Sequence, residues 1–426
     1  MREMWRTPAG RGFIMLGVMG AAFGFAMNAH GGIVTNYFND VLHLSGPQFG
    51  YIMAIREIGG FVLIFLTAAF YRVSLQRLTA GALVVLAIGY ALYSLAGDFW
   101  TVIPWVLVTS FGMHTVLQTQ TSLGMSLTTA ARSGSVLGRL GAVQQGGTLA
   151  GLVMVFLIFK LHWLSYRPTF IILGAVAFIA ALAVVRFPHL HEGQLRRVAP
   201  KREPIVWSRH YRLYYWVCLL DGARQQIFFS FGTWVLVNRF GLEVKDVVLV
   251  LLAVTFAGIF TSPWLGRAVD RYGERRILSI INIAFIGALA GYALANSVIM
   301  AAVFYCVYVV IAPTAFIGGS TYLRKICAPR DLSASLAMGL TIAHATAIAV
   351  PVVTGFILNF VGYQVPFFIA CGIAVVAFFV TLRLDPSKQK CPARIAADEA
   401  STQQVAAQPD DAQPTGHPSV GDQRTL

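Results

Sequence analysis

The sequence contains few charged residues and few cysteines. Only 12% of its 426 residues are Asp, Glu, Lys or Arg, whereas soluble domains carry roughly 25%. Its five cysteines are scattered, without a Cys-x-x-Cys pair or a Cys/His spacing that holds metal, so neither a disulfide framework nor a metal site is expected. The sequence also lacks a phosphate-binding Walker loop and the HExxH and GxSxG motifs of hydrolases. We therefore expect no catalytic residue and no cofactor.

Long apolar runs fill the chain instead. The sequence is 57% hydrophobic and its mean hydropathy is +0.68. A helix that crosses the hydrocarbon core needs about 20 mostly apolar residues. The runs predict an all-α polytopic membrane protein with twelve transmembrane helices, at about 13–38, 49–71, 78–96, 100–126, 135–159, 168–186, 212–238, 246–265, 277–295, 298–322, 333–358 and 364–384.

The distribution of arginine predicts the orientation. The net charge of +14 could indicate nucleic-acid binding, but the basic residues lie in short segments between apolar runs, as membrane topology requires. Arginines gather at the N-terminus and in alternate linkers, while the intervening linkers carry little net positive charge. The positive-inside rule then predicts a multi-pass protein of the plasma (inner) membrane, with both termini cytoplasmic and no nucleic-acid partner.

Composition also divides the chain into segments. We predict an N-terminal six-helix bundle at 1–187 and a C-terminal six-helix bundle at 212–384. Between them, residues 188–211 are basic and include Pro200 and Pro204, which indicates a cytoplasmic linker. Residues 385–426 have almost no large apolar side chains, which predicts a disordered cytoplasmic tail.

One polar stretch, Gly266 to Leu278, carries a recognisable motif. It reads Gly-x-x-x-Asp-Arg-Tyr-Gly-x-Arg-Arg and is expected to be a loop between two spanning helices. The pattern resembles the hallmark loop of the major facilitator superfamily of secondary transporters. The resemblance implies the family's fold of two six-helix bundles. It also implies that this loop belongs to a cytoplasmic gate, whose residues here are Gly266, Asp270, Arg271, Gly273, Arg275 and Arg276.

The first half carries only a degenerate copy of this motif. Tyr71 stands where the resemblance calls for the acid, and Ser74 stands where it calls for the second glycine. The fourth predicted helix also lacks the arginine that family members often use in proton coupling. These departures weaken any claim of drug/proton antiport.

Polar residues inside the apolar runs are the candidate site, because ionisable groups at membrane depth usually face a cavity or a partner. Counting about 1.5 Å per residue places Asp221, Glu57 and His344 near the midplane, at depths of about 14 to 18 Å. Transporters of this architecture bind substrate at that depth. The candidates for substrate binding or coupling are Asn28, His30, Arg56, Glu57, His114, Gln118, Gln144, Asp221, Arg224, Gln225 and His344.

Each candidate also has a structural interpretation. Arg56–Glu57 and Asp221–Arg224 can be ion pairs that neutralise each other permanently. Asn28, Gln118 and Gln144 can be hydrogen-bonded between helices, and His30 and His344 can be packed in the core.

The sequence-based hypothesis is secondary transport of a small organic solute by alternating access. Two arginines and two acids at cavity depth favour an organic anion, with a proton as the coupling ion. The alternatives are an exporter of cationic or amphipathic compounds, a uniporter, and a transporter-like sensor or assembly protein. The expected partners are the solute, a proton or other ion and the lipid bilayer, and the protein is expected to be a monomer.

Overall fold

The computed structural model describes residues 7–69, 73–128, 133–188, 208–396 and 399. In this part of the chain the long secondary-structure elements are all α-helices. They are α1 Pro8–Asp40, α2 Gly46–Ala69, α3 Leu75–Leu92, α4 Phe99–Ser126, α5 Ser133–Lys160, α6 Tyr166–Val185, α8 Arg212–Asn238, α9 Val244–Tyr272, α10 Glu274–Ala293, α11 Val298–Ile311, α12 Pro313–Ile326, α13 Leu332–Val361 and α14 Gln364–Thr381.

The helix ends follow local capping rules. Thr7 precedes Pro8 and accepts a hydrogen bond from the Gly10 N–H at 3.1 Å, so α1 begins there. Asp98 and Thr101 form a capping box at the start of α4, in which the Asp98 carboxylate accepts the Thr101 N–H at 2.8 Å. Only Ala312, with helical φ and ψ, separates α11 from Pro313 at the start of α12, so the predicted span at 298–322 is one membrane span, Val298–Ile326, interrupted at the proline.

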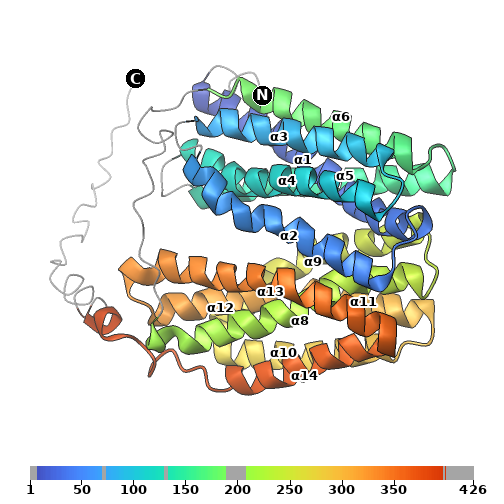
Figure 1. Ribbon diagram of the computed structural model, residues 1–426. Coiled ribbons are helices and arrows are strands. Elements are labelled where there is room, and N and C mark those ends of the chain that lie inside the picture. Colours follow the sequence, from blue (N-terminus) through green and yellow to red (C-terminus); the bar gives the residue numbers. More distant parts are fainter. Residues whose placement is uncertain (1–6, 70–72, 129–132, 189–207, 397–398, 400–426) are drawn as a thin grey trace, which may run out of the picture.

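The helices form two groups of six spans, with α11 and α12 counted together. In the first group α1 packs on α5 and α6, and α3 packs on α4 and α6; in the second group α8 packs on α13 and α14, and α10 packs on α14. Figure 1 shows the two groups one above the other, with α2 and α13 along the boundary. Within the described residues, ten spans are long and apolar enough to cross a membrane. The other two, α2 and α8, carry the charged candidates Arg56, Glu57, Asp221 and Arg224.

Two long seams join the groups. Helix α2 packs along α13, and α5 packs along α9. We call the face where α1 begins and α14 ends the terminal face, and the opposite one the distal face. Near the distal face a Cβ on Gly50 would overlap the Pro351 carbonyl, so the absence of a side chain there allows α2 to approach α13 closely.

This conformation is closed at the distal face. Phe49 of α2 stacks on Trp234 of α8 with ring centroids 4.3 Å apart. Close by, the Asn36 side chain donates to the Leu242 carbonyl at 2.8 Å, and the Asn238 side chain donates to that of Asn39 at 2.8 Å. These contacts hold the two groups together on that side.

The stretch from Gly266 to Leu278 is mostly helical, so the prediction of a loop was wrong. Helix α9 continues to Tyr272, and α10 begins at Glu274. Only Gly273 lies between them, with φ +81° and ψ 155°. The residues before it have ordinary helix propensity and continue α9, and a single glycine in a backbone conformation that L side chains rarely adopt makes the whole turn.

The beginning of the predicted disordered tail is also ordered. After α14, Tyr322 donates a hydrogen bond to the Gln389 side chain at 2.6 Å, and the Cys391 N–H donates to the Ile326 carbonyl at 2.9 Å. Leu384 and Cys391 are buried against the end of α12. These few apolar anchors order residues 385–396, while residues 400–426 and most of the predicted linker, 189–207, lie outside the described part of the chain.

Candidate functional site

Arg56 and Glu57 lie near the middle of α2, at the boundary between the groups. The Arg56 guanidinium contacts the Glu57 carboxylate at 3.1 Å. The Glu57 side chain is 11% exposed, whereas the Arg56 side chain is 41% exposed. The Ser110 hydroxyl of α4 donates to the Arg56 carbonyl, and the absence of a side chain at Gly59 gives Ser110 the room to do so. The Glu57 carboxylate is therefore buried in the protein, while the Arg56 side chain is partly exposed.

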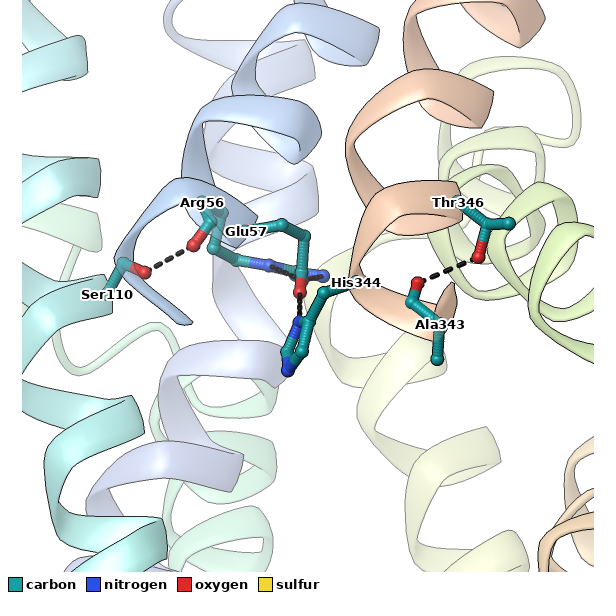
Figure 2. Close-up of polar contacts among 6 residues, drawn as sticks. All are labelled: Arg56, Glu57, Ser110, Ala343, His344 and Thr346. Carbon is teal, nitrogen blue, oxygen red and sulfur yellow. Dashed lines mark hydrogen bonds and ion pairs between the residues drawn. The ribbon is translucent and has the colours of Figure 1, made fainter. Parts of the chain in front are cut away.

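Glu57 contacts His344 across the boundary. The second carboxylate oxygen of Glu57 lies 3.6 Å from Nδ1 of His344 on α13, and this contact is an ion pair when the imidazole is protonated. Figure 2 shows the Glu57 carboxylate between Arg56 and His344. The sequence predicted that both Glu57 and His344 lie near the midplane, and the structure brings them together from different groups.

His114 of α4 adds a second imidazole to this cluster. Its ring centroid is 6.0 Å from that of His344. Both ring nitrogens of His114 are buried, and no described residue forms a hydrogen bond with them. Both imidazoles pack against Gly60, where a Cβ would come within 2.9 Å of His114 and 3.1 Å of His344. The spacing of Gly60 three residues after Glu57 could have indicated this role from the sequence, because residues i and i+3 share a helix face.

Asp221 and Arg224 lie elsewhere, inside the second group. Arg224 is 1% exposed and forms an ion pair with Asp221 one turn earlier. Its guanidinium also donates to the Tyr308 hydroxyl at 3.0 Å and lies 3.4 Å from the centre of the Phe285 ring. These contacts tie α8 to α10 and α11. They favour the structural interpretation of the pair, because the guanidinium is already surrounded.

The remaining polar candidates are spread over the first group and α8. Asn28 donates to the Thr148 hydroxyl at 3.0 Å and so links α1 to α5. His30 packs among Tyr90, Tyr93 and Phe170, with ring centroids 4.6, 4.9 and 5.8 Å away. Gln118 is exposed on α4, and Gln225 is half-buried on α8.

Gln144 lines a cavity that the sequence did not predict. The cavity has a volume of about 210 Å³ and lies between α1, α4 and α5. Besides Gln144, its polar lining comes from Gln120 and Thr121 of α4. Which polar residues of α4 turn toward α1 and α5 depends on how these helices are rotated, and the sequence shows no clear apolar stripe to fix that rotation.

The gate-motif residues lie at the terminal face. Asp270 is exposed near the end of α9, and within residues 208–396 the structure describes no hydrogen bond or ion pair for its side chain. Glu274, which follows Gly273, is 2% exposed and forms an ion pair of 2.7 Å with Lys325 of α12. Of the other motif residues, Arg271, Arg275 and Arg276 are exposed, and Gly266 is half-buried.

The expected gating role of Asp270 applies when the terminal face closes, so its lack of a partner here agrees with closure at the distal face instead.

We expect Asp270→Asn to slow transport while equilibrium solute binding stays within a few-fold of wild type, because a neutral side chain loses the charge that stabilises a closed terminal face. Initial uptake rates and binding titrations measure the two effects. Asp98→Asn, another exposed acid at a helix end, is the control. Full transport activity in Asp270→Asn would reduce the motif to an orientation signal.

Comparison with known proteins decides the family. The sequence profile described as Major Facilitator Superfamily matches residues 14–313 and 219–409. The chain belongs to the major facilitator superfamily. A mutant form of the nucleoside transporter NupG superposes with a TM-score of 0.74 at 16% identity, covering 88% of this chain and 99% of that one.

A second solved structure agrees in fold. It is a bacterial homologue of the human lysosomal transporter Spinster, in an inward-facing and occupied conformation, with a TM-score of 0.67 at 14% identity, covering 89% of this chain and 98% of that one. Comparison with curated proteins gives no match. Membership of the family confirms the resemblance drawn from Gly266 to Arg276. It identifies the protein as an integral, multi-pass secondary transporter of the membrane rather than an enzyme.

Proposed function

We propose that this family member transports a small organic anion, coupled to a proton, by alternating access of a central site. The observation that carries the proposal is the Arg56–Glu57–His344 cluster at the boundary between the two helix groups. Alternating access moves one bundle against the other around a site at the midplane. Groups that meet across that boundary change their surroundings in every cycle, which is what coupling requires.

Arg56 is the proposed anion-binding residue. Its Nε and one terminal nitrogen donate to the same Glu57 oxygen, at 3.3 and 3.1 Å, and no described residue bonds its other terminal nitrogen. An arginine stays charged when buried, and its planar fork suits a carboxylate or phosphate. The sequence assigned this role first to Arg224, with Arg56 as a possible second group; we assign it to Arg56, because Arg56 is partly exposed and Arg224 is enclosed.

Glu57 and His344 are the proposed proton-coupling groups. A carboxylate and an imidazole in contact can share or release a proton when their separation or solvation changes. Glu57 belongs to α2 and His344 to α13, so a relative movement of the groups alters their contact directly.

Replacement of Arg56 by lysine tests anion binding. Arg56→Lys keeps the charge but loses the fork, so we expect an anionic solute to bind at least about tenfold more weakly, which is roughly 1.4 kcal/mol. A solute panel is first screened by thermal stabilisation of the purified protein. The affinity of its best anion is then measured for both forms by calorimetry. Arg77→Lys, an exposed arginine on α3, is the control. Unchanged affinity in Arg56→Lys, or a best ligand without negative charge, would contradict the proposal.

The terminal face is the proposed cytoplasmic face, on the basis of its arginines. In a background without the native cysteines, new cysteines at Ser45 and Asn296, both exposed at the distal face, should react with an impermeant maleimide on intact cells. Cysteines at Ser74 and Ser387, on the terminal side, should react only after lysis. Labelling of Ser74→Cys from outside would reverse the orientation.

A further inference from the structure

We propose that Glu57 has two alternative histidine partners. It pairs with His344 of the second group while the distal face is closed, and with His114 of its own group when that face opens. The inference rests on the proposed function, because the exchange would keep the coupling acid compensated throughout the cycle.

The two imidazoles are placed so that either one can serve as the partner of the Glu57 carboxylate. Gly60 lies on the same face of α2 as Glu57, three residues later, and His114 and His344 both pack against it. Their ring centroids are 6.0 Å apart. His344 contacts the Glu57 carboxylate, and the nitrogens of His114 have no described hydrogen-bond partner. His344 therefore contacts Glu57, while His114 lies close to His344 and has no described hydrogen-bond partner.

We expect the movement of the groups to separate His344, but not His114, from α2. The described seam between α2 and α13 runs from Gly46, which lies against Gly355, to Gly60, which lies against His344. Opening the distal face separates this seam and takes His344 away from Glu57. Helix α4 moves with α2, because Gly59 is packed against Ser110 too closely for a side chain to fit between them. His114 therefore stays against Gly60, on the face of α2 that carries Glu57.

The energetic reason for an exchange is the cost of leaving the second Glu57 oxygen, the one that contacts His344, without a partner at this depth. A carboxylate inside the membrane needs a partner, and a buried imidazole without a hydrogen bond is also unfavourable. Arg56, on the same helix, is paired with the first oxygen and moves with Glu57, so the exchange concerns the second oxygen alone. Asp221 and Arg224 lie on α8, which packs on α13, and they neutralise each other. A contact between Glu57 and His114 satisfies both residues in the distal-open state.

The two histidines should consequently bias the conformational equilibrium in opposite directions. Removing His344 takes a partner from the distal-closed state, and removing His114 takes one from the distal-open state. A purely structural histidine has no reason to show this opposition.

Pulsed electron paramagnetic resonance tests the exchange on the full-length protein. Spin labels at Asn39→Cys and Asn238→Cys report the distal separation, in a background without the five native cysteines. Because the starting protein is closed at this face, the measurement is repeated with Phe49→Ala, which removes the stacking on Trp234 and is expected to populate both states. Fractions are taken from the short and long distances, without solute or pH gradient.

We expect His344→Gln to lower the closed-to-open ratio at least about fivefold and His114→Gln to raise it at least about fivefold. In Glu57→Gln neither histidine substitution should change the ratio further. His210→Gln, on an exposed residue at the terminal face, is the control. His114→Asn serves as a second variant where His114→Gln is not monodisperse. Shifts in the same direction, or no shift for either histidine, would overturn the exchange. Because no solute is present, failure of anion binding or of proton-driven uptake is seen separately.

Discussion

Glu57→Gln is expected to abolish solute accumulation driven by a pH gradient, while exchange of labelled for unlabelled solute continues. Glutamine keeps the size and hydrogen-bonding capacity of the side chain but cannot release a proton, and it removes the charge that contacts His344. Net uptake and counterflow in proteoliposomes, each with and without a pH gradient, separate coupling from the movement of the carrier.

Asp221→Asn is the informative comparison. Asp221 is paired with the enclosed Arg224, so its loss should lower the amount and thermal stability of folded protein, because breaking a buried pair leaves an uncompensated charge. Folded Asp221→Asn protein should still couple uptake to the pH gradient. Undiminished proton-driven accumulation in Glu57→Gln would eliminate Glu57 as the proton carrier, and its loss in well-folded Asp221→Asn would assign that role to Asp221.

A disulfide across the distal face is expected to stop transport completely. Asn39 is the last residue but one of α1 and Asn238 ends α8, and their side chains are joined by a hydrogen bond of 2.8 Å. Cysteines at these two positions, oxidised in a background without the native ones, should lock the distal face shut and prevent the site from reaching that side. Uptake into proteoliposomes is measured before oxidation, after oxidation and after reduction.

Transport should return when the disulfide is reduced, and each single cysteine variant should be insensitive to the oxidant. Equilibrium binding from the terminal side should persist in the locked protein, since the disulfide lies at the distal helix ends and Arg56 lies near the middle of α2. Rapid transport by fully cross-linked protein would show that the distal contacts do not part during the cycle.

The sequence was informative about the fold because membrane helices leave a strong signal. Runs of about 20 apolar residues placed the spans, and the Asp270–Arg276 motif identified the family. The predictions that failed concern single residues. Gly273 alone makes the turn between α9 and α10, so composition over a window could not reveal that break.

The site was harder to predict than the fold. Depth along a helix follows from residue counting, which is why Glu57 and His344 could be expected at a similar level. Rotation about the helix axis does not follow, because α8 is packed on several sides and has no dominant apolar stripe. The spacing of Asp221 and Arg224 showed that they share a face, but it could not show that this face turns toward Phe285 and Tyr308 rather than toward α2.

The most direct measurement is uptake by the wild-type protein in proteoliposomes, with a panel of small carboxylates beside neutral and cationic compounds of similar size. An imposed pH gradient, acidic on the side from which the solute enters, should drive accumulation of at least one carboxylate above its external concentration. A protonophore should abolish the accumulation but not the exchange. Accumulation only of a neutral or cationic compound, or carboxylate uptake that ignores the gradient, would contradict proton-coupled anion transport through the Arg56–Glu57–His344 site.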